Sequence, residues 1–268
     1  REATNRSEGE CVRDRDKQGL CSSGHAAPEA ERKGQSRRVP REAVQSLAVV
    51  CPLTAFTKMA AVNVGDDQLY EANGDLAREV ANVVPYFPYK KIERFYDVQG
   101  LLMHPALFGK LCKAIAARYR QLGITKMIGF EARGFLFTQV AVELGVPFIM
   151  ARKQGKMPNT ISSAPYTKEY AGVDVMCIQR GAVGPGDKVL LMDDLIATGG
   201  TLCSGIELVK SCGAEVTECC CMVELKALRG RDRCLAAGAK SVWGFISEEL
   251  LIIKAKLPDD YVDDGAAH

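Results

Sequence analysis

Residues 189–201 constrain the fold of this chain more than any other segment. Four apolar residues lead directly into two aspartates, and a short loop with Gly199 and Gly200 follows. The pattern predicts a strand over residues 188–192 and an amphipathic helix over 201–212. A strand that is apolar on both faces is typical of a sheet covered on both sides. The segment therefore predicts a strand–loop–helix unit within an α/β fold.

Strand and helix patterns alternate through the chain after residue 104. The predicted strands are residues 126–130, 146–151, 173–178, 218–223 and 241–246, and the predicted helices are 104–122 and 134–144. Such alternation predicts right-handed crossover connections and a central, mostly parallel sheet flanked by helices. Ligands of such sheets bind beyond the carboxyl ends of the strands. The conspicuous polar motifs of this chain fall at those predicted strand ends.

Composition excludes several classes of protein. The 268 residues carry a formal net charge of +2, too little for a protein that binds nucleic acid through general basic charge. No apolar run is long enough to cross a bilayer. The 11 cysteines include no CxxC pair, which predicts buried thiols in a reducing cytoplasm. Residues 1–58 are rich in Arg, Glu, Ser and Gly, and this composition predicts a disordered leader or an added segment.

The loop of residues 197–201 and the acids before it predict a ligand. Two glycines let the backbone turn its N–H groups inward, and the hydroxyls of Thr198 and Thr201 add donors. The start of the following helix adds positive potential, so the segment predicts a phosphate site. Asp193 and Asp194 can accept hydrogen bonds from vicinal hydroxyls and favour a hard cation. A strand–glycine–helix connection alone is common, but the complete block is more specific and indicates a ribose 5-phosphate ligand.

This block resembles the phosphoribosyl pyrophosphate signature of the type I phosphoribosyltransferases. Its residues are Asp193, Asp194, Leu195, Ile196, Ala197, Thr198, Gly199, Gly200 and Thr201. The Ala-Thr-Gly-Gly-Thr variant is similar to the adenine phosphoribosyltransferases, and the wider resemblance is greatest to their protozoan members. Hypoxanthine-guanine enzymes carry an Asp proton acceptor where this chain has Ala197, so that mechanism is not available here. The resemblance implies the type I fold with a small hood subdomain, and transfer of ribose 5-phosphate from phosphoribosyl pyrophosphate to adenine, giving AMP and pyrophosphate.

Cationic residues at two other predicted strand ends match the same family. Arg133 opens a predicted helix, where the helix dipole disfavours a cation, and this makes a ligand role more credible than a surface role. Arg152, Lys153 and Lys156 follow the strand over 146–151, and a solvated charge cluster is the alternative interpretation. The resemblance implies that these four cations bind pyrophosphate and that Arg133 is also catalytic.

The loop over residues 155–172 is long for a compact domain and resembles the mobile lid of the family. Within it, the resemblance implies that Glu169 is a catalytic residue that exchanges a proton with the purine ring, and that Tyr170 contacts pyrophosphate. For the base, it implies that Phe95 stacks on adenine and that Arg94 offers backbone groups. A core aromatic is an equally good interpretation of Phe95.

Mg²⁺ is the cofactor that the resemblance implies, held mainly through the substrate and water near Asp193 and Asp194. The resemblance also implies a homodimer, with a hood and base-recognition segment at residues 59–103, a core at 104–246 and a C-terminal extension at 247–268. No nucleic-acid or membrane partner is expected. Two alternatives stay open: a transferase for another base (xanthine, guanine or orotate), and a non-catalytic regulator that senses phosphoribosyl pyrophosphate.

Overall fold

The computed structural model describes residues 70–167, 173–263 and 265, all within one unit of the chain, Ala60–His268. The predicted leader at 1–58 therefore lies outside the described residues. A seven-stranded sheet runs in the order β11-β10-β9-β3-β4-β8-β5. Its strands are β3 (Lys126–Phe130), β4 (Phe148–Lys153), β5 (Thr160–Ser162), β8 (Met176–Gln179), β9 (Lys188–Ile196), β10 (Glu215–Glu224) and β11 (Val242–Ser247).

The sheet is mostly parallel, as its sequence pattern predicts. Strands β11, β10, β9, β3 and β4 pair in parallel, and β8 runs antiparallel to both β4 and β5. The chain leaves β3 toward β4 on one side, and later returns to β9 on the other side of β3. The connections therefore reverse direction between β3 and β9. Ligands of open α/β sheets bind at such a switch point, beyond the strand ends.

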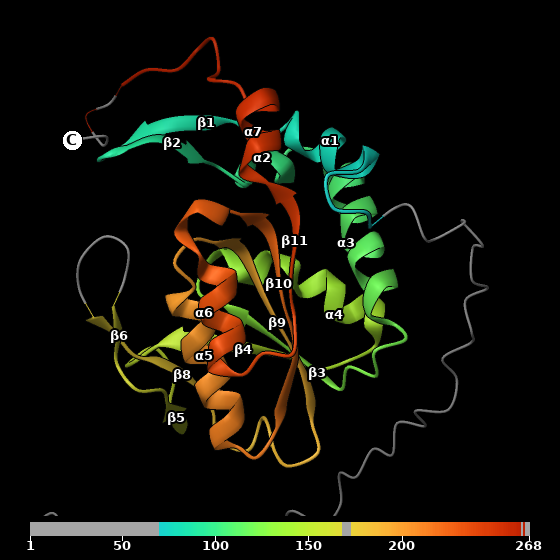
Figure 1. Ribbon diagram of the computed structural model, residues 1–268, viewed down its shortest axis with the longest axis vertical. Helices are drawn as coiled ribbons and strands as arrows, with labels where there is room; N and C mark the ends of the chain where they lie inside the picture. The colour runs from blue at the N-terminus through green and yellow to red at the C-terminus, as the bar shows by residue number, and fades with distance from the viewer. Residues whose placement is uncertain (1–69, 168–172, 264, 266–268) are drawn as a thin grey trace, which may run out of the picture. The chain divides into compact units, whose positions relative to one another are not determined.

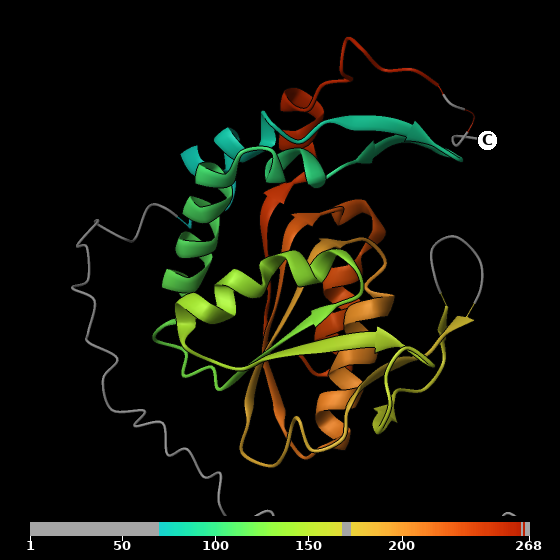
Figure 2. The ribbon, with the colours of Figure 1, turned by 180° about the vertical axis from the view of Figure 1, so that it is seen from behind.

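Helices cover both faces of the sheet (Figures 1 and 2). α3 (Pro105–Tyr119) and α4 (Thr138–Leu144) lie on one face, and α5 (Gly200–Ser211) and α6 (Gly230–Ala237) lie on the other. The three consecutive cysteines of β10 show the two faces directly. Cys220 belongs to the core cluster under α3, whereas Cys219 and Cys221 belong to the cluster under α5. All three thiols are buried and free, so the prediction of small buried hydrophobes is confirmed for them.

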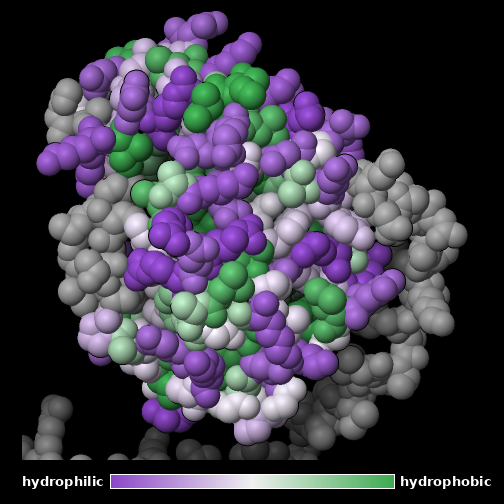
Figure 3. All heavy atoms as spheres, in the orientation of Figure 1, coloured by the Kyte–Doolittle hydropathy of each residue, from purple (hydrophilic) through white to green (hydrophobic). Residues whose placement is uncertain are grey.

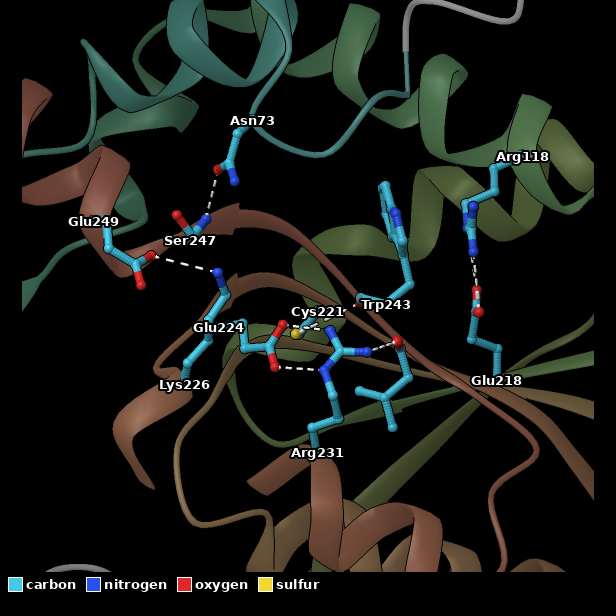
Figure 4. A network of polar contacts seen from close by, with 11 residues as sticks. Asn73, Arg118, Glu218, Cys221, Glu224, Lys226, Arg231, Trp243, Ser247 and Glu249 are labelled. Atoms are coloured by element: carbon cyan, nitrogen blue, oxygen red, sulfur yellow. Dashed lines mark hydrogen bonds and ion pairs between the residues drawn. The ribbon is translucent and has the colours of Figure 1, made fainter. Parts of the chain in front are cut away.

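A smaller group of elements stands beside the strand ends (Figure 1). It contains α1 (Asp75–Ala81), β1 (Tyr86–Tyr89), β2 (Ile92–Tyr96), α2 (Gln99–Leu102) and α7 (Glu248–Lys254). β1 and β2 form an antiparallel hairpin. The N–H of Tyr86 donates to the carbonyl of Lys256 at 3.2 Å, so the segment after α7 is tied to the hairpin. The side chain of Asn73 accepts from the N–H of Ser247 at 2.8 Å, which joins this group to the end of β11 (Figure 4).

Several predicted boundaries were wrong, and tertiary pairing explains two of them. β9 continues to Ile196 because β10 pairs with it as far as Glu224 opposite Ile196, so both aspartates lie inside the strand. β4 is displaced two residues toward the C-terminus, because Arg152 and Lys153 pair with β8. The predicted strand over 173–178 divides into β7 (Val173–Asp174) and β8, with β7 paired to β6 (Tyr166–Thr167).

The predicted helix over 134–144 starts differently from the expectation. Its first part is a 3-10 helix, Arg133–Phe137, and α-helical geometry begins only at Thr138. It ends at Gly145 in the left-handed conformation, which satisfies the last carbonyls as a glycine cap does. A second 3-10 turn, Lys226–Leu228, precedes α6. The 3-10 helix over Arg133–Phe137 brings Arg133 close to the end of β9.

The described surface is mainly hydrophilic on the face drawn in Figure 3, with hydrophobic atoms gathered where α7 lies. α7 exposes Ile252 and Ile253, which are 50% and 76% accessible. None of the helices in the described ranges is long and apolar enough to traverse a bilayer.

Candidate active site

A cavity of about 330 Å³ opens beyond the carboxyl ends of β9 and β3. Its walls come from five separate parts of the chain: the hairpin, the turn after β3, the end of β4, β7, and the end of β9 with the start of α5. The lining residues are Phe95, Glu131, Ala132, Arg133, Lys153, Asp174, Asp193, Asp194, Leu195, Ile196, Ala197, Gly199, Gly200, Thr201 and Leu202. The cavity therefore brings together predicted residues for the base, the ribose, the phosphate and the pyrophosphate.

The phosphate loop, defined here as Ala197–Thr201, connects β9 to α5. Gly199 has a φ of 80°, a conformation that disfavours residues with a side chain. α5 begins at Gly200, and the N–H groups of its first turn have no partner within the helix. Their partial positive charge lies at one end of the cavity. The geometry suits a phosphate dianion, as the loop sequence predicts.

The two aspartates are hydrogen-bonded neighbours, of which Asp194 is buried and Asp193 is half-buried at the cavity wall. The N–H of Asp194 donates to Oδ1 of Asp193 at 2.9 Å, and Asp194 is 5% accessible. Burial, followed by repulsion from Asp194, raises the pKa of Asp193 well above its usual range. Burial also raises the pKa of Asp194, although the Arg133 guanidinium acts in the opposite direction. A ligand with hydroxyl donors or a cation would stabilise the charged form of this pair.

Arg133 links the acids to the hairpin. Its Nε lies 2.8 Å from Oδ2 of Asp194, and its Cζ lies 5.1 Å from the centroid of the Phe95 ring. Phe95 is half-buried and also packs on Tyr89, with ring centroids 5.3 Å apart. The ring therefore borders the cavity rather than the interior of a core. Arg133 therefore lies between the two aspartates and the aromatic wall formed by Phe95 and Tyr89.

Glu131, to which the sequence analysis gave no role, binds the cationic residues at the end of β4. Its carboxylate accepts from the guanidinium of Arg152 at 3.3 and 3.4 Å and from the N–H of Lys153 at 3.1 Å. Burial acts to raise the pKa of Glu131, but the hydrogen bonds from Arg152 and Lys153 hold it below its usual value. Nζ of Lys153 lies 3.3 Å from Oδ2 of Asp174, a second unassigned wall residue.

The remaining predicted residues are distributed unevenly. The cavity lining lacks Thr198, Arg152 and Lys156, and Arg152 also donates to the carbonyl of Lys156 at 3.3 Å. The Arg94 side chain is directed away from the site, toward the carbonyl of Ile252 and the Tyr86 ring. Glu169 and Tyr170 lie outside the described residues. Glu131 could have been found from the sequence, because it stands in the same block as Arg133. Nothing in the sequence marks Asp174 as a site residue.

A second cavity of about 710 Å³ adjoins the first. Phe95 and Arg133 line both cavities. Its other lining residues are Phe87, Pro88, Tyr89, Asp97, Gln99, Pro258, Asp260, Tyr261 and Val262. The hairpin and the C-terminal segment therefore form a partly aromatic space next to the residues predicted for the phosphate and the ribose.

The carboxylate oxygens at the first cavity suit a Mg²⁺ ion that is held mainly by the phosphates of a bound substrate. Carboxylate oxygens are the donors that this ion prefers, and it usually keeps waters and substrate phosphates in its shell. Asp193 and Asp194 supply such oxygens at the cavity wall. Among the described residues, no group of three or more His, Cys, Asp or Glu side chains forms a complete metal cage. The arrangement fits an ion that arrives with a polyanionic substrate.

Comparison with known proteins identifies the family. Residues 97–249 match the family model of the phosphoribosyl transferase domain. Adenine phosphoribosyltransferase 4 of Arabidopsis thaliana is 40% identical over 171 residues, which cover 63% of this chain and 93% of that protein. The enzyme of Caenorhabditis elegans is 46% identical over 150 residues, covering 55% of this chain and 80% of that protein.

Solved structures agree with the sequence relatives. The adenine phosphoribosyl transferase of Trypanosoma brucei, crystallised with AMP, pyrophosphate and ribose-5-phosphate, superposes with a TM-score of 0.62 at 31% identity. That match covers 72% of this chain and 85% of the trypanosomal chain. This protein belongs to the phosphoribosyltransferase family, and its relatives place it among the adenine phosphoribosyltransferases.

Proposed function

We propose that this protein transfers ribose 5-phosphate from phosphoribosyl pyrophosphate to adenine, releasing AMP and pyrophosphate in purine salvage. The observation that carries the proposal is a single cavity that joins the phosphate loop, the Asp193–Asp194 pair and the Phe95 ring. These are complementary to the three parts of AMP: an anion, a diol and a flat base. The relatives named adenine phosphoribosyltransferase support adenine over xanthine, guanine or orotate.

The two ends of the sugar phosphate are held by different chemistry. The N–H groups and hydroxyls of Ala197–Thr201 bind the 5-phosphate. Asp193 and Asp194 accept hydrogen bonds from the ribose hydroxyls. With both ends held, C1′ is fixed in place, and attack by the base becomes effectively unimolecular. The phosphate loop and acid pair therefore contribute positioning rather than covalent chemistry.

Departure of pyrophosphate is the step that needs charge stabilisation. Substitution at C1′ through an oxocarbenium-like transition state develops negative charge on the leaving group, and fixed cations stabilise it. Arg133 and Lys153 line the cavity, and Arg152 stands behind Glu131. Bound Mg²⁺ would neutralise further charge on the same group. Glu169 and Tyr170, in the segment over 155–172, are proposed for proton transfer to the purine and for pyrophosphate contact.

Arg133 changes partners in this scheme. In the structure it pairs with Asp194 at 2.8 Å. Pyrophosphate, with more charge than one carboxylate, competes for the guanidinium, and the ribose hydroxyls then take its place at Asp194. Substrate binding thereby converts an internal ion pair into two sets of ligand contacts.

A spectrophotometric assay tests the proposal. The full chain is mixed with phosphoribosyl pyrophosphate, Mg²⁺ and one base at a time, and AMP formation is expected with adenine far above xanthine, guanine and orotate. Chelation of divalent metal with EDTA should abolish turnover, and Mg²⁺ should restore it. Binding of phosphoribosyl pyrophosphate without turnover of any base would instead identify a non-catalytic sensor.

Two further expectations belong with this proposal. A homodimer should elute at twice the mass of the chain, 29.1 kDa, in size-exclusion chromatography with light scattering. Cytoplasmic residence is checked by fractionating cells and following the adenine-dependent activity.

A further inference from the structure

The start of α6 lies against the backbone of the phosphate loop. A Cβ atom added to Gly230 would lie 2.3 Å from the carbonyl oxygen of Ala197 and 2.9 Å from the nitrogen of Gly199. A Cβ atom on Gly199 would lie 2.8 Å from the carbonyl oxygen of Gly230. Real Cβ atoms do not come this close to backbone atoms, so only glycine fits on either side of the contact. The two backbones pack directly on one another.

A hydrogen bond fixes the orientation of one loop peptide. The guanidinium of Arg233, one turn into α6, donates to the carbonyl oxygen of Thr198 at 2.8 Å. In a trans peptide the C=O of one residue and the N–H of the next point in opposite directions. Holding the Thr198 carbonyl toward α6 therefore turns the N–H of Gly199 to the other side. Gly199 itself lines the first cavity.

α6 is held firmly by the sheet, so it can act as a rigid support. Figure 4 shows Arg231 donating to both carboxylate oxygens of Glu224, at the end of β10. Arg231 also donates to the carbonyl of Val242, at the start of β11. The Glu224 side chain is 7% accessible. The hydrogen bonds that Arg231 donates to Glu224 raise the pKa of Arg231, so its guanidinium stays charged. The first turn of α6 is therefore anchored to two strands.

We infer that Gly230 and Arg233 are positioning residues for the 5-phosphate end of the substrate. They touch the loop from behind and hold its N–H groups toward the cavity, which neither of them lines. The inference rests on the proposed function, because the loop is the proposed phosphate site. Its consequence is selective: loss of this support weakens the binding of phosphoribosyl pyrophosphate and leaves the binding of adenine, at the Phe95 end, nearly unchanged.

Arg233→Ala tests the inference in the full chain. The KM for phosphoribosyl pyrophosphate should rise about five- to tenfold, the range expected for the net loss of one ordinary hydrogen bond. The KM for adenine should change less than about twofold, and Arg233→Lys should restore part of the loss. Arg229→Ala is the matched control, because Arg229 is exposed and pairs only with Asp232 among the described contacts.

Gly230→Ala gives a stronger test of the same support. The added methyl group must displace the loop, and the KM for phosphoribosyl pyrophosphate should rise on the order of ten- to a hundredfold, as small misplacements at a reacting site do. Gly184→Ala is its control, since no atom lies within 4 Å of a Cβ at that position. The melting temperature and the affinity for AMP by calorimetry separate loop displacement from unfolding.

The outcomes distinguish the inference from the proposed function. If the unaltered chain turns over no base, the proposed function is wrong. If it is active and Arg233→Ala behaves as Arg229→Ala does, the inference alone is wrong. Equal increases in both KM values, or a lower melting temperature with both KM values unchanged, would show that α6 has only a general structural role.

Discussion

Asp193 and Asp194, the proposed ribose residues, lie where the folded protein disfavours their charge. Both carboxyl groups have a raised pKa, chiefly because they are shielded from water. A folded-state pKa above the unfolded value means that the folded protein holds the proton more tightly. Ionisation therefore lowers the free energy of unfolding, and the loss grows as the pH rises above the ordinary value of 3.8.

Asp193→Asn should consequently stabilise the ligand-free protein while impairing it as an enzyme. The amide oxygen can still accept from the N–H of Asp194, but it carries no charge. At pH 8 the free energy of unfolding should increase, because the amide removes the cost of ionising a carboxyl group whose pKa is raised in the folded protein. The gain should shrink as the pH falls toward 4, where the native carboxyl group is protonated too.

Thermal and urea unfolding between pH 4 and pH 8 check this prediction, and calorimetry should show weaker phosphoribosyl pyrophosphate binding. Asp259→Asn, at an exposed position, is the control and should change neither quantity. A variant less stable than the native chain at pH 8 would contradict the assignment of a raised pKa to Asp193.

Glu169→Gln tests the residue assigned to proton exchange with the purine, on the family resemblance. An amide cannot accept or return the proton, so kcat should fall by about a hundredfold or more while KM changes little. Steady-state kinetics measure both. The exposed Glu207 on α5 offers Glu207→Gln as a control, and a normal kcat for Glu169→Gln would remove Glu169 from the chemistry.

At the scale of single elements, close packing of α5 on the sheet depends on a residue without a side chain. A Cβ atom on Gly205 would lie 2.4 Å from Cζ of Phe130, which is fully buried in β3. Gly205→Ala should therefore reduce the free energy of unfolding by about 1–3 kcal/mol, the usual cost of overpacking.

Gly109→Ala in α3 is the opposite case and the matched control. The nearest atom to a Cβ there is Nε2 of Gln139, at 3.9 Å. This substitution should stabilise the protein by about 0.5–1 kcal/mol, because alanine loses less entropy in a helix. Urea unfolding measures both variants, and equal effects on stability would exclude the packing explanation.

The strands and helices whose ends could be predicted from the sequence are those that begin and end where their own residue pattern changes. β3 was predicted with its observed ends, because apolar residues stop where Glu131 begins. β9 was predicted too short, because pairing with β10 carries the strand through two aspartates that favour a turn. The 3-10 geometry at Arg133 has no simple signal either, since the Arg-Gly-Phe sequence is compatible with an ordinary helix start.

At the scale of the whole described molecule, the site depends on contacts between distant segments. Phe95 reaches the same cavity as Asp194 through the hairpin, and Asp174 reaches it through β7. The phosphate loop could be proposed as a site from the sequence because its residues are consecutive, and its role stays a prediction. The aromatic wall and the carboxylates that hold the cations could not be predicted from the residues alone, because long-range packing brings them there. The C-terminal segment is the clearest case, since nothing in its sequence assigns it to a ligand site.

Tyr261 tests whether that C-terminal segment matters to the base. Its ring lies 5.8 Å from the ring of Phe87, and it lines the second cavity together with Phe95. Tyr261→Ala removes part of the wall on the base side and leaves the phosphate loop untouched. The KM for adenine should rise about two- to fivefold, in line with the loss of one aromatic contact, while the KM for phosphoribosyl pyrophosphate stays the same.

Ile253→Ala is the appropriate comparison, because Ile253 is 76% accessible on α7 and lines neither cavity. Both variants are assayed at saturating concentrations of one substrate while the other is varied. Equal increases in both KM values for Tyr261→Ala would show that the segment only supports the hairpin. A selective increase for adenine would show that the segment after α7, beyond the matched phosphoribosyltransferase domain at 97–249, contributes to recognition of the base.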